Sequence, residues 1–514
     1  MTQSKNVLTD KGTSEPASTK KKRTGISGFD HISHGGLPLG RPTLVAGTAG
    51  SAKTLFASHF LAGGIQQFNE PGVFVTFEEP PVDIRDNLTD FGWDISAWER
   101  DKMWLFVDIS PNLDVDTYVN GDFEMSAIVA RIEHAVRSIG AKRVVLDSIS
   151  ALFSQFKDTL TVRRELFSIC SALKRMGVTS IVTAERTSDY GEVARFGVEE
   201  FVADSVVLLR NPLELEKRRR TIEVLKFRGS SHQKGECPFT ILDKQGLAFI
   251  PLSSIELTQK SSMQRIHSGV KELDTMCGGG YFKDSIILLS GATGTGKSLT
   301  VTHFAKGGSL TKEKTLIFAF EESKEQFFRN ARGWGMDFKE MEEQELLQVH
   351  CQYPESAGLE EHLFVMQDMI DHFKPQRVAI DSLTALERIS LPKPYREFVL
   401  CISSFLKERE ITGLFTCTTP TLLGGPSITE SHISTITDTI VLLRYVELNG
   451  EMQRGITVIK MRGSEHDKQI RRFVIDSTGM HVREPFEHIS GILAGHPVYV
   501  GADDLVRIQQ MFNE

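Results

Sequence analysis

The sequence predicts an α/β protein made of two tandem domains, each with a mainly parallel sheet. The chain has 514 residues, which is too long for one hydrophobic core and long enough for two domains. Short β-branched runs, such as residues 73–77 and 144–146, alternate with stretches of helical character, as βαβ units do. An internal repeat indicates that both halves follow one plan.

The repeat is clearest at residues 24–54, which are echoed by residues 267–298. Later landmarks recur in the same order: VVLDSISAL with VAIDSLTAL, DSVVLLR with DTIVLLR, and VLKFRGSSH with VIKMRGSEH. The aspartates of the first two pairs and the lysines of the third are each separated by 234 positions (381 − 147, 438 − 204 and 460 − 226). We therefore expect the second halves of the two copies to align without a gap.

The repeat also sets the expected boundaries. The first residues are polar and lack apolar periodicity, as disordered tails do, and the segment between the copies has the polar character of a linker. The predicted segments are a disordered tail (1–23), a first domain (24–250), a linker (251–263), a second domain (264–486) and a C-terminal loop and tail (487–514).

Composition and charge exclude several classes of function. With 40% hydrophobic and 25% charged residues the chain has the composition of a globular protein, and its net charge of −8 argues against a general polyanion binder. No apolar run is long enough to cross a bilayer and no signal peptide is evident, so we expect a cytoplasmic protein without a membrane partner. Its 6 cysteines lack CxxC spacing and are expected to be reduced and mostly buried.

A phosphate-binding loop is predicted in each copy. In the second copy an apolar strand leads into a Walker A sequence and then a helix, so backbone N–H groups would surround phosphate oxygens at a helix N-terminus. The expected ATP-binding residues of this loop are Gly291, Thr293, Gly294, Thr295, Gly296, Lys297 and Ser298. Those of the first copy are Gly47, Thr48, Ala49, Gly50, Ser51, Ala52, Lys53 and Thr54.

The first loop departs from the Walker A pattern, because Ala52 stands where the second copy has Gly296. Glycine permits backbone conformations that a Cβ obstructs. Since the lysine and the hydroxyl residue are kept, we expect nucleotide binding in the first copy, while its rate of turnover is left open.

Carboxylates follow the apolar strands in both copies. Asp147 and Asp381 stand where a Walker B aspartate orders the Mg²⁺ shell, the alternative being a helix N-cap. Together with Thr54 and Ser298, and with Glu321, they are the expected metal-binding residues. Adjacent glutamates end another strand in each copy and are the expected general bases, the alternative being a solvated loop: Glu78 with Glu79, and Glu321 with Glu322.

A K-x-R-G-S-x-H motif leaves a late strand in each copy. In ring-forming P-loop proteins, lysine and arginine side chains from the neighbouring subunit often stabilise transition-state charge. The alternative is that the motif is a charged strand edge that deters aggregation. The ATP-binding residues expected from the two motifs are Lys226, Arg228, Ser230 and His232, and Lys460, Arg462, Ser464 and His466.

Paired glutamates, the K-x-R-G-S-x-H motif and ITESHISTITDTI at residues 428–440 together resemble the KaiC family, over about residues 24–486. The resemblance implies two tandem RecA-like P-loop NTPase domains in a double-ring homohexamer of a circadian clock or timing protein. ATP and Mg²⁺ would lie between protomers in both rings. The first ring would be a slow ATPase, and the second a serine/threonine kinase that phosphorylates and dephosphorylates itself.

By the family pattern the phospho-acceptors are Ser434 and Thr435, with Thr429 as an accessory hydroxyl. Subtracting 234 from these positions gives Glu200, Phe201 and Arg195, none of which has an aliphatic hydroxyl. Only the second copy would then accept phosphate, unless the Ser/Thr run merely reflects strand propensity.

The resemblance also bears on partners. Residues 487–514 match the family's KaiA-binding tail only loosely, which argues against KaiA, and residues 110–122 leave a KaiB-like partner at the first ring open. Two other functions remain as alternatives: a nucleic-acid motor on the same fold, and a nucleotide-gated scaffold. The acidic balance and the absence of an aromatic and basic loop argue against nucleic acid. Stimulation of ATP hydrolysis by DNA would favour the motor.

Overall fold

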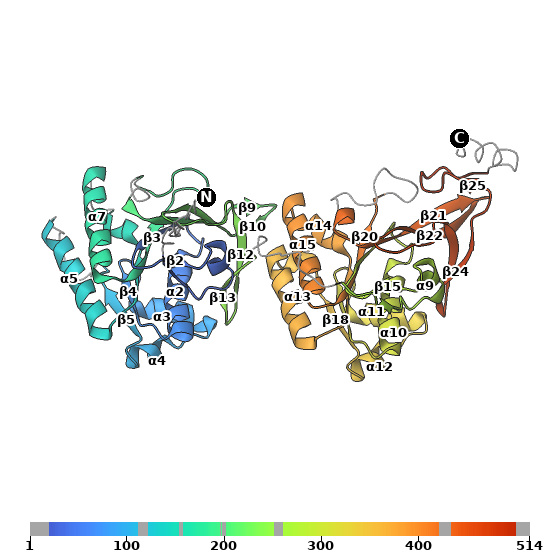
Figure 1. Cartoon of the computed structure of the whole chain (residues 1–514), viewed down its shortest axis with the longest axis horizontal. Helices are drawn as coiled ribbons and strands as arrows, with labels where there is room; N and C mark the ends of the chain where they lie inside the picture. Colours follow the sequence, from blue (N-terminus) through green and yellow to red (C-terminus); the bar gives the residue numbers. More distant parts are fainter. Residues whose placement is uncertain are drawn as a thin grey trace, which may run out of the picture. The chain divides into compact units, whose positions relative to one another are not determined.

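The computed structural model describes residues 20–110, 122–153, 158–195, 197, 202–250, 261–420 and 433–499. It divides into two compact units, Met1–Ser254 and Ile255–Glu514, each with its own core (Figure 1). Within the described residues each unit contains one nine-stranded, mostly parallel sheet. The predicted fold of two tandem RecA-like α/β domains is confirmed.

In the first unit the strand order across the sheet places the antiparallel strands at one side. The order is β13 (Gly246–Phe249), β12 (Cys237–Leu242), β11 (Thr221–Phe227), β8 (Ser205–Arg210), β3 (Pro42–Gly47), β7 (Thr179–Glu185), β6 (Arg143–Asp147), β4 (Gly72–Thr76) and β5 (Trp104–Asp108). The strands from β8 to β5 are parallel, and the inner ones are buried on both faces, whereas the edge strand β5 is partly exposed.

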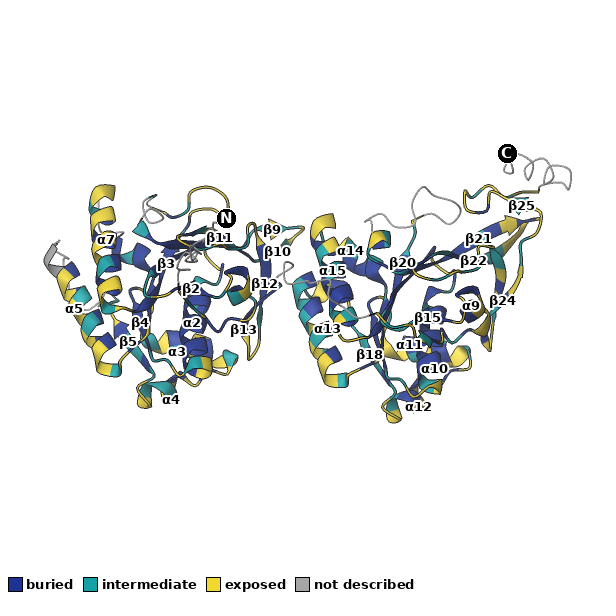
Figure 2. Ribbon diagram, in the orientation of Figure 1, coloured by how far each residue is buried: buried dark blue, intermediate teal, exposed yellow. Residues whose placement is uncertain are grey.

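Helices cover both faces of this sheet. One cluster of buried side chains joins α2 and α3 to alternate residues of the central strands, and another joins α5, α6 and α7 to the residues between them (Figure 2). The helices are α1 (Phe29–Ile32), α2 (Lys53–Phe68), α3 (Pro81–Leu88), α4 (Ile95–Arg100), α5 (Asp122–Ile139), α6 (Ile149–Phe153) and α7 (Thr159–Met176), with the 3-10 turn η1 (Thr89–Phe91). Two short hairpins pair β1 (Lys21–Lys22) with β2 (Leu37–Pro38), and β9 (Leu213–Glu214) with β10 (Lys217–Arg218).

The second unit repeats the strand order. Its sheet runs β18 (Leu347–Cys351), β17 (Thr315–Ala319), β19 (Arg377–Asp381), β20 (Thr412–Thr418), β16 (Ile286–Gly291), β21 (Thr439–Leu448), β22 (Glu451–Met461), β23 (Arg471–Asp476) and β24 (Gly479–Pro485). The helices are α9 (Lys271–Met276), α10 (Lys297–Leu310), α11 (Lys324–Gly333), α12 (Phe338–Glu343), α13 (Leu359–Phe373), α14 (Leu383–Arg388) and α15 (Pro392–Glu408). Shorter elements are β14 (Arg265–Ile266) with β15 (Tyr281–Phe282), β25 (Ile489–Ser490) with β26 (Val498–Tyr499), and the 3-10 turns η3 (Pro354–Ser356) and η4 (Ile433–Thr435). No described helix combines the length and the apolar character that crossing a membrane requires.

The expectation that the second halves align without a gap is wrong over one stretch. In the first sheet Leu146 pairs with Val182, and in the second Ile380 pairs with Phe415. Leu146 and Ile380, on the Walker B strands of the two copies, differ by 234 positions (380 − 146). Their partners Val182 and Phe415 differ by 233 (415 − 182). The segment that joins the Walker B strand to the next strand of the sheet is therefore one residue shorter in the second copy (β19 to β20) than in the first (β6 to β7). The segment from β20 to β21 is one residue longer than that from β7 to β8. Both changes lie in connections, where insertions leave the sheet intact.

The first domain begins earlier than the predicted boundary at residue 24. Lys21 and Lys22 form β1, Lys22 Nζ lies 2.5 Å from Glu70 Oε1, and Arg143 donates to the carbonyl of Arg23 at 2.7 Å. Polar composition suggested a tail through residue 23, but here the lysines find partners on the folded domain. Residues 1–19 and 251–260 lie outside the described residues, so the tail and linker predictions stay predictions there.

The two phosphate-binding loops differ in backbone at their last turn. Ala52 lies at φ 73° and ψ 31°, in the left-handed region that an alanine enters at a cost of about 1 kcal/mol. Gly296 lies at φ 108° and ψ 23°, and a Cβ added there would lie 3.1 Å from Ile475 Cδ1. The first loop therefore accommodates the side chain of Ala52 at a smaller φ than the one that Gly296 adopts in the second loop.

We expect Gly296→Ala to lower the free energy of unfolding of the second domain by about 1–3 kcal/mol, because it places a side chain in a strained and crowded backbone position. Urea unfolding followed by fluorescence measures this. Gly333→Ala is the control, because a Cβ in that turn of α11 meets nothing within 4 Å. Equal stabilities of the two variants would contradict the explanation.

Candidate nucleotide and catalytic sites

Each phosphate-binding loop connects a central strand to a long buried helix, β3 to α2 and β16 to α10. The loop lysine folds back on its own loop: Lys53 Nζ donates to the carbonyl of Thr48 at 3.0 Å, and Lys297 Nζ donates to those of Gly291 and Ala292, each at 3.0 Å. Burial lowers the pKa of both lysines, and nearby carboxylates oppose that shift. Both ammonium groups therefore lie beside the helix N-terminus, where anions are stabilised.

The strand-ending aspartates lie where the Walker B prediction put them. Asp147 ends β6, and its Oδ2 accepts a hydrogen bond from Thr54 Oγ1 at 2.7 Å, while Thr183 donates to its other oxygen. Burial raises the pKa of Asp147, and the hydroxyl bonds and Lys53 counteract the rise. The first copy thus brings the predicted metal-binding hydroxyl and carboxylate together. In the second, Asp381 ends β19 and accepts from Thr416 Oγ1 at 2.5 Å.

The paired glutamates of the first copy directly follow β4, beside Asp147 and Lys53. Burial raises the pKa of Glu78, and the negative charges of Glu185, Asp147 and Glu79 raise it further, while Lys53 lowers it. Burial and Asp147 likewise raise the pKa of Glu79. A carboxylate with a raised pKa accepts a proton more readily, which suits a general base.

The second pair has a different environment. Glu322 accepts from Asn330 Nδ2 at 3.0 Å, and burial, followed by Asp381, raises its pKa. Glu321 forms an ion pair with Arg388, a residue that the sequence analysis did not single out. A metal or proton role for Glu321 therefore requires Arg388 to move or to share the carboxylate.

Glu185 is a further carboxylate that the sequence analysis missed. It ends β7 opposite Gly47, and its side chain lies 3.6 Å from Arg195. In the second sheet the residue opposite Gly291 is Thr418. The repeat gave no signal for Glu185, because the two copies carry different residues at this strand end.

A cavity of about 290 Å³ adjoins the first loop. Gly50, Ala52, Lys53 and Thr54 form its phosphate end, and mostly apolar side chains form the rest: Leu55, Ile84, Leu88, Phe91 and Ile241, with Asn87 and Glu79. An apolar slot beside a phosphate loop suits a nucleoside. Sequence analysis missed these residues because apolar positions on a helix such as α3 look like ordinary core.

The K-x-R-G-S-x-H motifs do not lie at their own chain's phosphate loops. β11 is antiparallel to β8, so Lys226 lies opposite Val206, whereas Gly47 lies opposite Leu209. In the second sheet Lys460 lies opposite Ile440, and Gly291 opposite Leu443. In each sheet the motif lysine and the glycine that begins the phosphate loop are therefore three residues apart along the neighbouring strand, which is about 10 Å. The rest of each motif continues away from the loop.

Within the motifs, several side chains already have local partners. Ser464 Oγ accepts from Arg265 at 2.6 Å, and Ser230 Oγ donates to the carbonyl of Ser231 at 3.1 Å. Burial lowers the pKa of His232, and the charges of His34 and Lys21 add to the shift. Each K-x-R-G-S-x-H motif therefore forms a cationic edge on its own domain, away from the phosphate-binding loop of the same domain.

The predicted acceptors lie at this same edge of the second domain. Ser434 and Thr435 belong to η4, which precedes β21 and is held by the buried side chain of Ile433. Lys460 Nζ donates to the carbonyls of Ser434 and Thr437, each at 2.7 Å, and Arg462 Nη2 donates to that of Thr435 at 2.8 Å. Thr429, Glu200 and Phe201 lie outside the described residues.

These loops, aspartates and cavity define the class of protein: a P-loop ATPase with two sites per chain. A family model described as "ATPase: KaiC" matches residues 22–254 and again 266–487. The chain belongs to the KaiC family.

Curated relatives agree over nearly the whole chain. It is 60% identical over 495 residues to "Circadian clock protein KaiC3" of Synechocystis sp., covering 96% of this chain and 98% of that protein. It is 54% identical to "Circadian clock oscillator protein KaiC" of Thermostichus vulcanus, over 96% and 95% of the two chains. The protein of the same name from Synechococcus elongatus is 52% identical, over 96% and 94%.

Hydrolysis by the first domain should fall as pH falls through the raised pKa of Glu78, because a protonated carboxyl cannot accept a proton from water. Glu185→Gln removes a negative charge that raises this pKa, so the acidic limb of the pH–rate profile should move to lower pH. The profile is measured with Glu321→Gln and Glu322→Gln in the background to silence the second domain. Glu133→Gln, on α5, is the control, and an unmoved limb in Glu185→Gln would contradict the coupling.

Proposed function

We propose that this chain is a clock or timing protein, as its relatives are named, and acts as a homohexameric ATPase whose second domain also phosphorylates and dephosphorylates itself. Ser434 and Thr435 are the proposed acceptors, with Thr429 as an accessory hydroxyl. One observation supports the proposal: each domain has a lysine-bearing phosphate-binding loop and a strand-ending aspartate, while the turn beside Lys460 bears two hydroxyls. A protein kinase needs such an acceptor held at a defined place.

ATP and Mg²⁺ are the proposed cofactors. Thr54 with Asp147 supports a magnesium shell in the first domain, because a hydroxyl and a carboxylate 2.7 Å apart suit an octahedral ion that keeps several waters. Ser298 and Asp381 are the corresponding candidates in the second domain. Bound Mg²⁺ would neutralise phosphate charge; Lys53 and Lys297 would add positive charge from the loop.

In hydrolysis, Glu78 or Glu79 would take the proton of the attacking water as its oxygen bonds to the γ-phosphorus and the bond to ADP breaks. In self-phosphorylation the hydroxyl of Ser434 or Thr435 would take the place of water, and Glu322 or Glu321 would receive its proton. The products are ADP and a phosphoserine or phosphothreonine. Dephosphorylation by water would return the hydroxyl and release inorganic phosphate.

Assembly follows from the positions of the reacting groups. The acceptor turn and both K-x-R-G-S-x-H motifs lie about 10 Å or more from the loop level of their own sheets. A second copy of the chain would bring its cations and hydroxyls to the open phosphate end of the first. The proposed hexamer therefore shares every ATP between two protomers. A KaiB-like partner at the first ring is compatible with this arrangement, whereas the loose C-terminal match argues against KaiA.

Ser434→Ala combined with Thr435→Ala should abolish stable phosphorylation and leave most ATP hydrolysis intact, since neither side chain belongs to the hydrolytic site of either domain. Intact mass after incubation with ATP and Mg²⁺ gives the phosphate content, and released phosphate gives the hydrolysis rate. Ser309→Ala, on α10, is a control for a distant hydroxyl. Full phosphate content in the double variant would show that the acceptors lie elsewhere.

Sharing of ATP is testable by mixing subunits. Lys53→Ala and Arg228→Ala should each reduce hydrolysis by the first domain by about 10²-fold, because each removes a charge from the transition state. A hexamer assembled from equal amounts of both regains roughly a quarter of its interfaces with both groups intact. Measured hydrolysis should recover accordingly. Lys53→Ala mixed with the chain carrying both changes has no intact interface, and recovery there, or none in the first mixture, would contradict sharing.

A further inference from the structure

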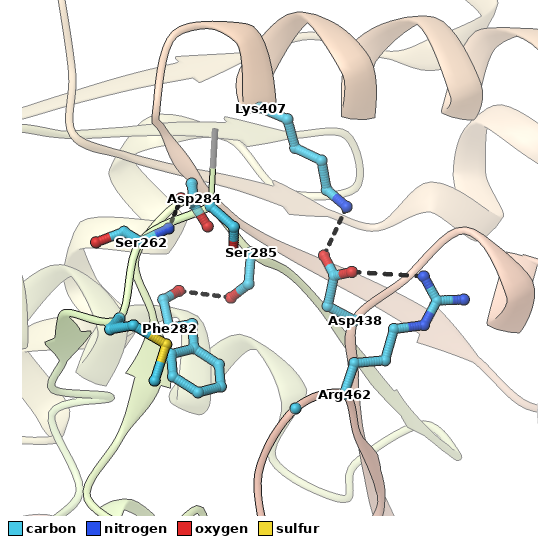
Figure 3. A pocket seen from close by; sticks show the side chains of 10 residues that line it. Ser262, Phe282, Asp284, Ser285, Lys407, Asp438 and Arg462 are labelled. Carbon is cyan, nitrogen blue, oxygen red and sulfur yellow. Dashed lines mark hydrogen bonds and ion pairs between the residues drawn. The ribbon is translucent and has the colours of Figure 1, made fainter. Parts of the chain in front are cut away.

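An aspartate at the start of β21 links three elements of the second domain. Asp438 Oδ2 lies 2.8 Å from Lys407 Nζ at the end of α15, and accepts from the backbone N–H of Ile286 at the start of β16 at 2.9 Å. Its other oxygen lies 3.7 Å from Arg462 Nη1. Figure 3 shows Lys407 approaching this carboxylate from above and Arg462 from the right; all three residues line a cavity of about 250 Å³.

Arg462 connects the carboxylate to the acceptor turn. One guanidinium nitrogen faces Asp438 and the other donates to the carbonyl of Thr435 at 2.8 Å. The backbone N–H of Arg462 also donates to the carbonyl of Asp438 at 3.0 Å. A planar guanidinium held at both nitrogens has one orientation, so the direction of Arg462 decides where the Thr435 carbonyl lies.

Lys407 balances the charge of Asp438. The lysine side chain is 23% exposed and that of Asp438 is 19% exposed, whereas Arg462 is 54% exposed. A carboxylate so shielded from water attracts the nearest cation strongly. If Lys407 lost its charge, Asp438 would attract Arg462 more strongly and compete with the Thr435 carbonyl for the guanidinium. The lysine thus keeps Arg462 divided between its two partners.

The first domain has the corresponding ion pairs, while the positions that match Ser434 and Thr435 hold Glu200 and Phe201, which have no aliphatic hydroxyl. Lys174, at the end of α7, lies 2.5 Å from Asp204, and Arg228 lies 3.7 Å from it. Arg41 lies 3.8 Å from the same carboxylate, at a position where the second domain has Ser285. Among the described residues, Asp438 therefore has one ion-pair partner fewer within 4 Å than Asp204, so it depends more on Lys407. The chain supplies a matched comparison between the two lysines.

We propose that Lys407 is a positioning residue for self-phosphorylation: through Asp438 it sets the direction of Arg462, and Arg462 holds the backbone of Thr435 where its hydroxyl meets the γ-phosphate. This inference rests on the proposed kinase activity and adds residues to it that do not touch the nucleotide. It assigns a role in phosphate transfer, and none in hydrolysis by the first domain, to a lysine 28 positions from Thr435 in the sequence (435 − 407).

Lys407→Gln should slow phosphorylation of Thr435 about tenfold, because a small displacement of an acceptor is costly in rate. The ratio of phosphate on Thr435 to phosphate on Ser434 should fall as well. The full-length hexamer is incubated with ATP and Mg²⁺, and phosphopeptides are quantified over time together with ATP hydrolysis and melting temperature. The melting temperature should match that of the unmodified protein, as should hydrolysis by the first domain, measured with Glu321→Gln and Glu322→Gln in the background. Lys407→Arg should restore the rate of Thr435 phosphorylation.

Two further variants decide between positioning and a general effect. Asp438→Asn keeps an acceptor for the Ile286 N–H but loses the charge; it should slow Thr435 phosphorylation as Lys407→Gln does, and the double variant should show no further loss. Lys174→Gln is the matched control and should leave phosphorylation unchanged.

The outcomes separate the inference from the proposed function. An unmodified protein that incorporates no phosphate overturns the kinase proposal and this inference with it. Normal phosphorylation in Lys407→Gln, an equal loss in Lys174→Gln, or a loss accompanied by lower first-domain hydrolysis or a lower melting temperature overturns the inference alone. Selective loss at Thr435, with rescue by arginine, supports it.

Discussion

The antiparallel direction of β11 and β22 is the constraint on which the rest of this molecule depends. These strands carry their cations to the edge of the sheet opposite the phosphate loop, so under the proposed function a single chain would not complete its own nucleotide sites. Lys226 and Lys460 instead bond to backbone carbonyls of the turns that precede β8 and β21. The active unit that we propose from this geometry is a ring, in which each protomer would supply the loop for one ATP and the cations for another.

Within that common frame the two domains have diverged at a few positions around the phosphate. The first loop ends in Ala52 and faces four carboxylates, since Asp147 and Glu185 join the glutamate pair. The second ends in Gly296, has Thr418 in place of Glu185, and pairs Glu321 with Arg388. More negative charge beside the attacking oxygen favours a proton acceptor for water. A less charged site beside a held hydroxyl turn is suited to phosphate transfer and its reversal.

The parts of this account visible in the sequence are those whose chemistry demands a residue type at a strand end. A lysine after a glycine-rich loop, an aspartate closing an apolar strand, and adjacent glutamates were all recognisable twice over, and the repeat made each copy evidence for the other. The fold class followed from the same repetition. The site residues that the sequence did not reveal either occur in only one copy or come together only in the folded structure. Glu185 has no counterpart, Arg388 pairs with Glu321 across 67 positions (388 − 321), and the slot beside α3 is made of ordinary core residues. The one-residue offset between the copies is likewise visible only in the sheet register.

The central claim, that each ATP is shared by two protomers, is tested most directly by native mass spectrometry of the purified protein with Mg²⁺ and a slowly hydrolysed ATP analogue. If two protomers share each ATP, we expect a hexamer that retains two nucleotides per chain and loses them as it dissociates. Monomers that hold two nucleotides as firmly as the hexamer does would contradict it, because one chain would then complete both of its sites alone.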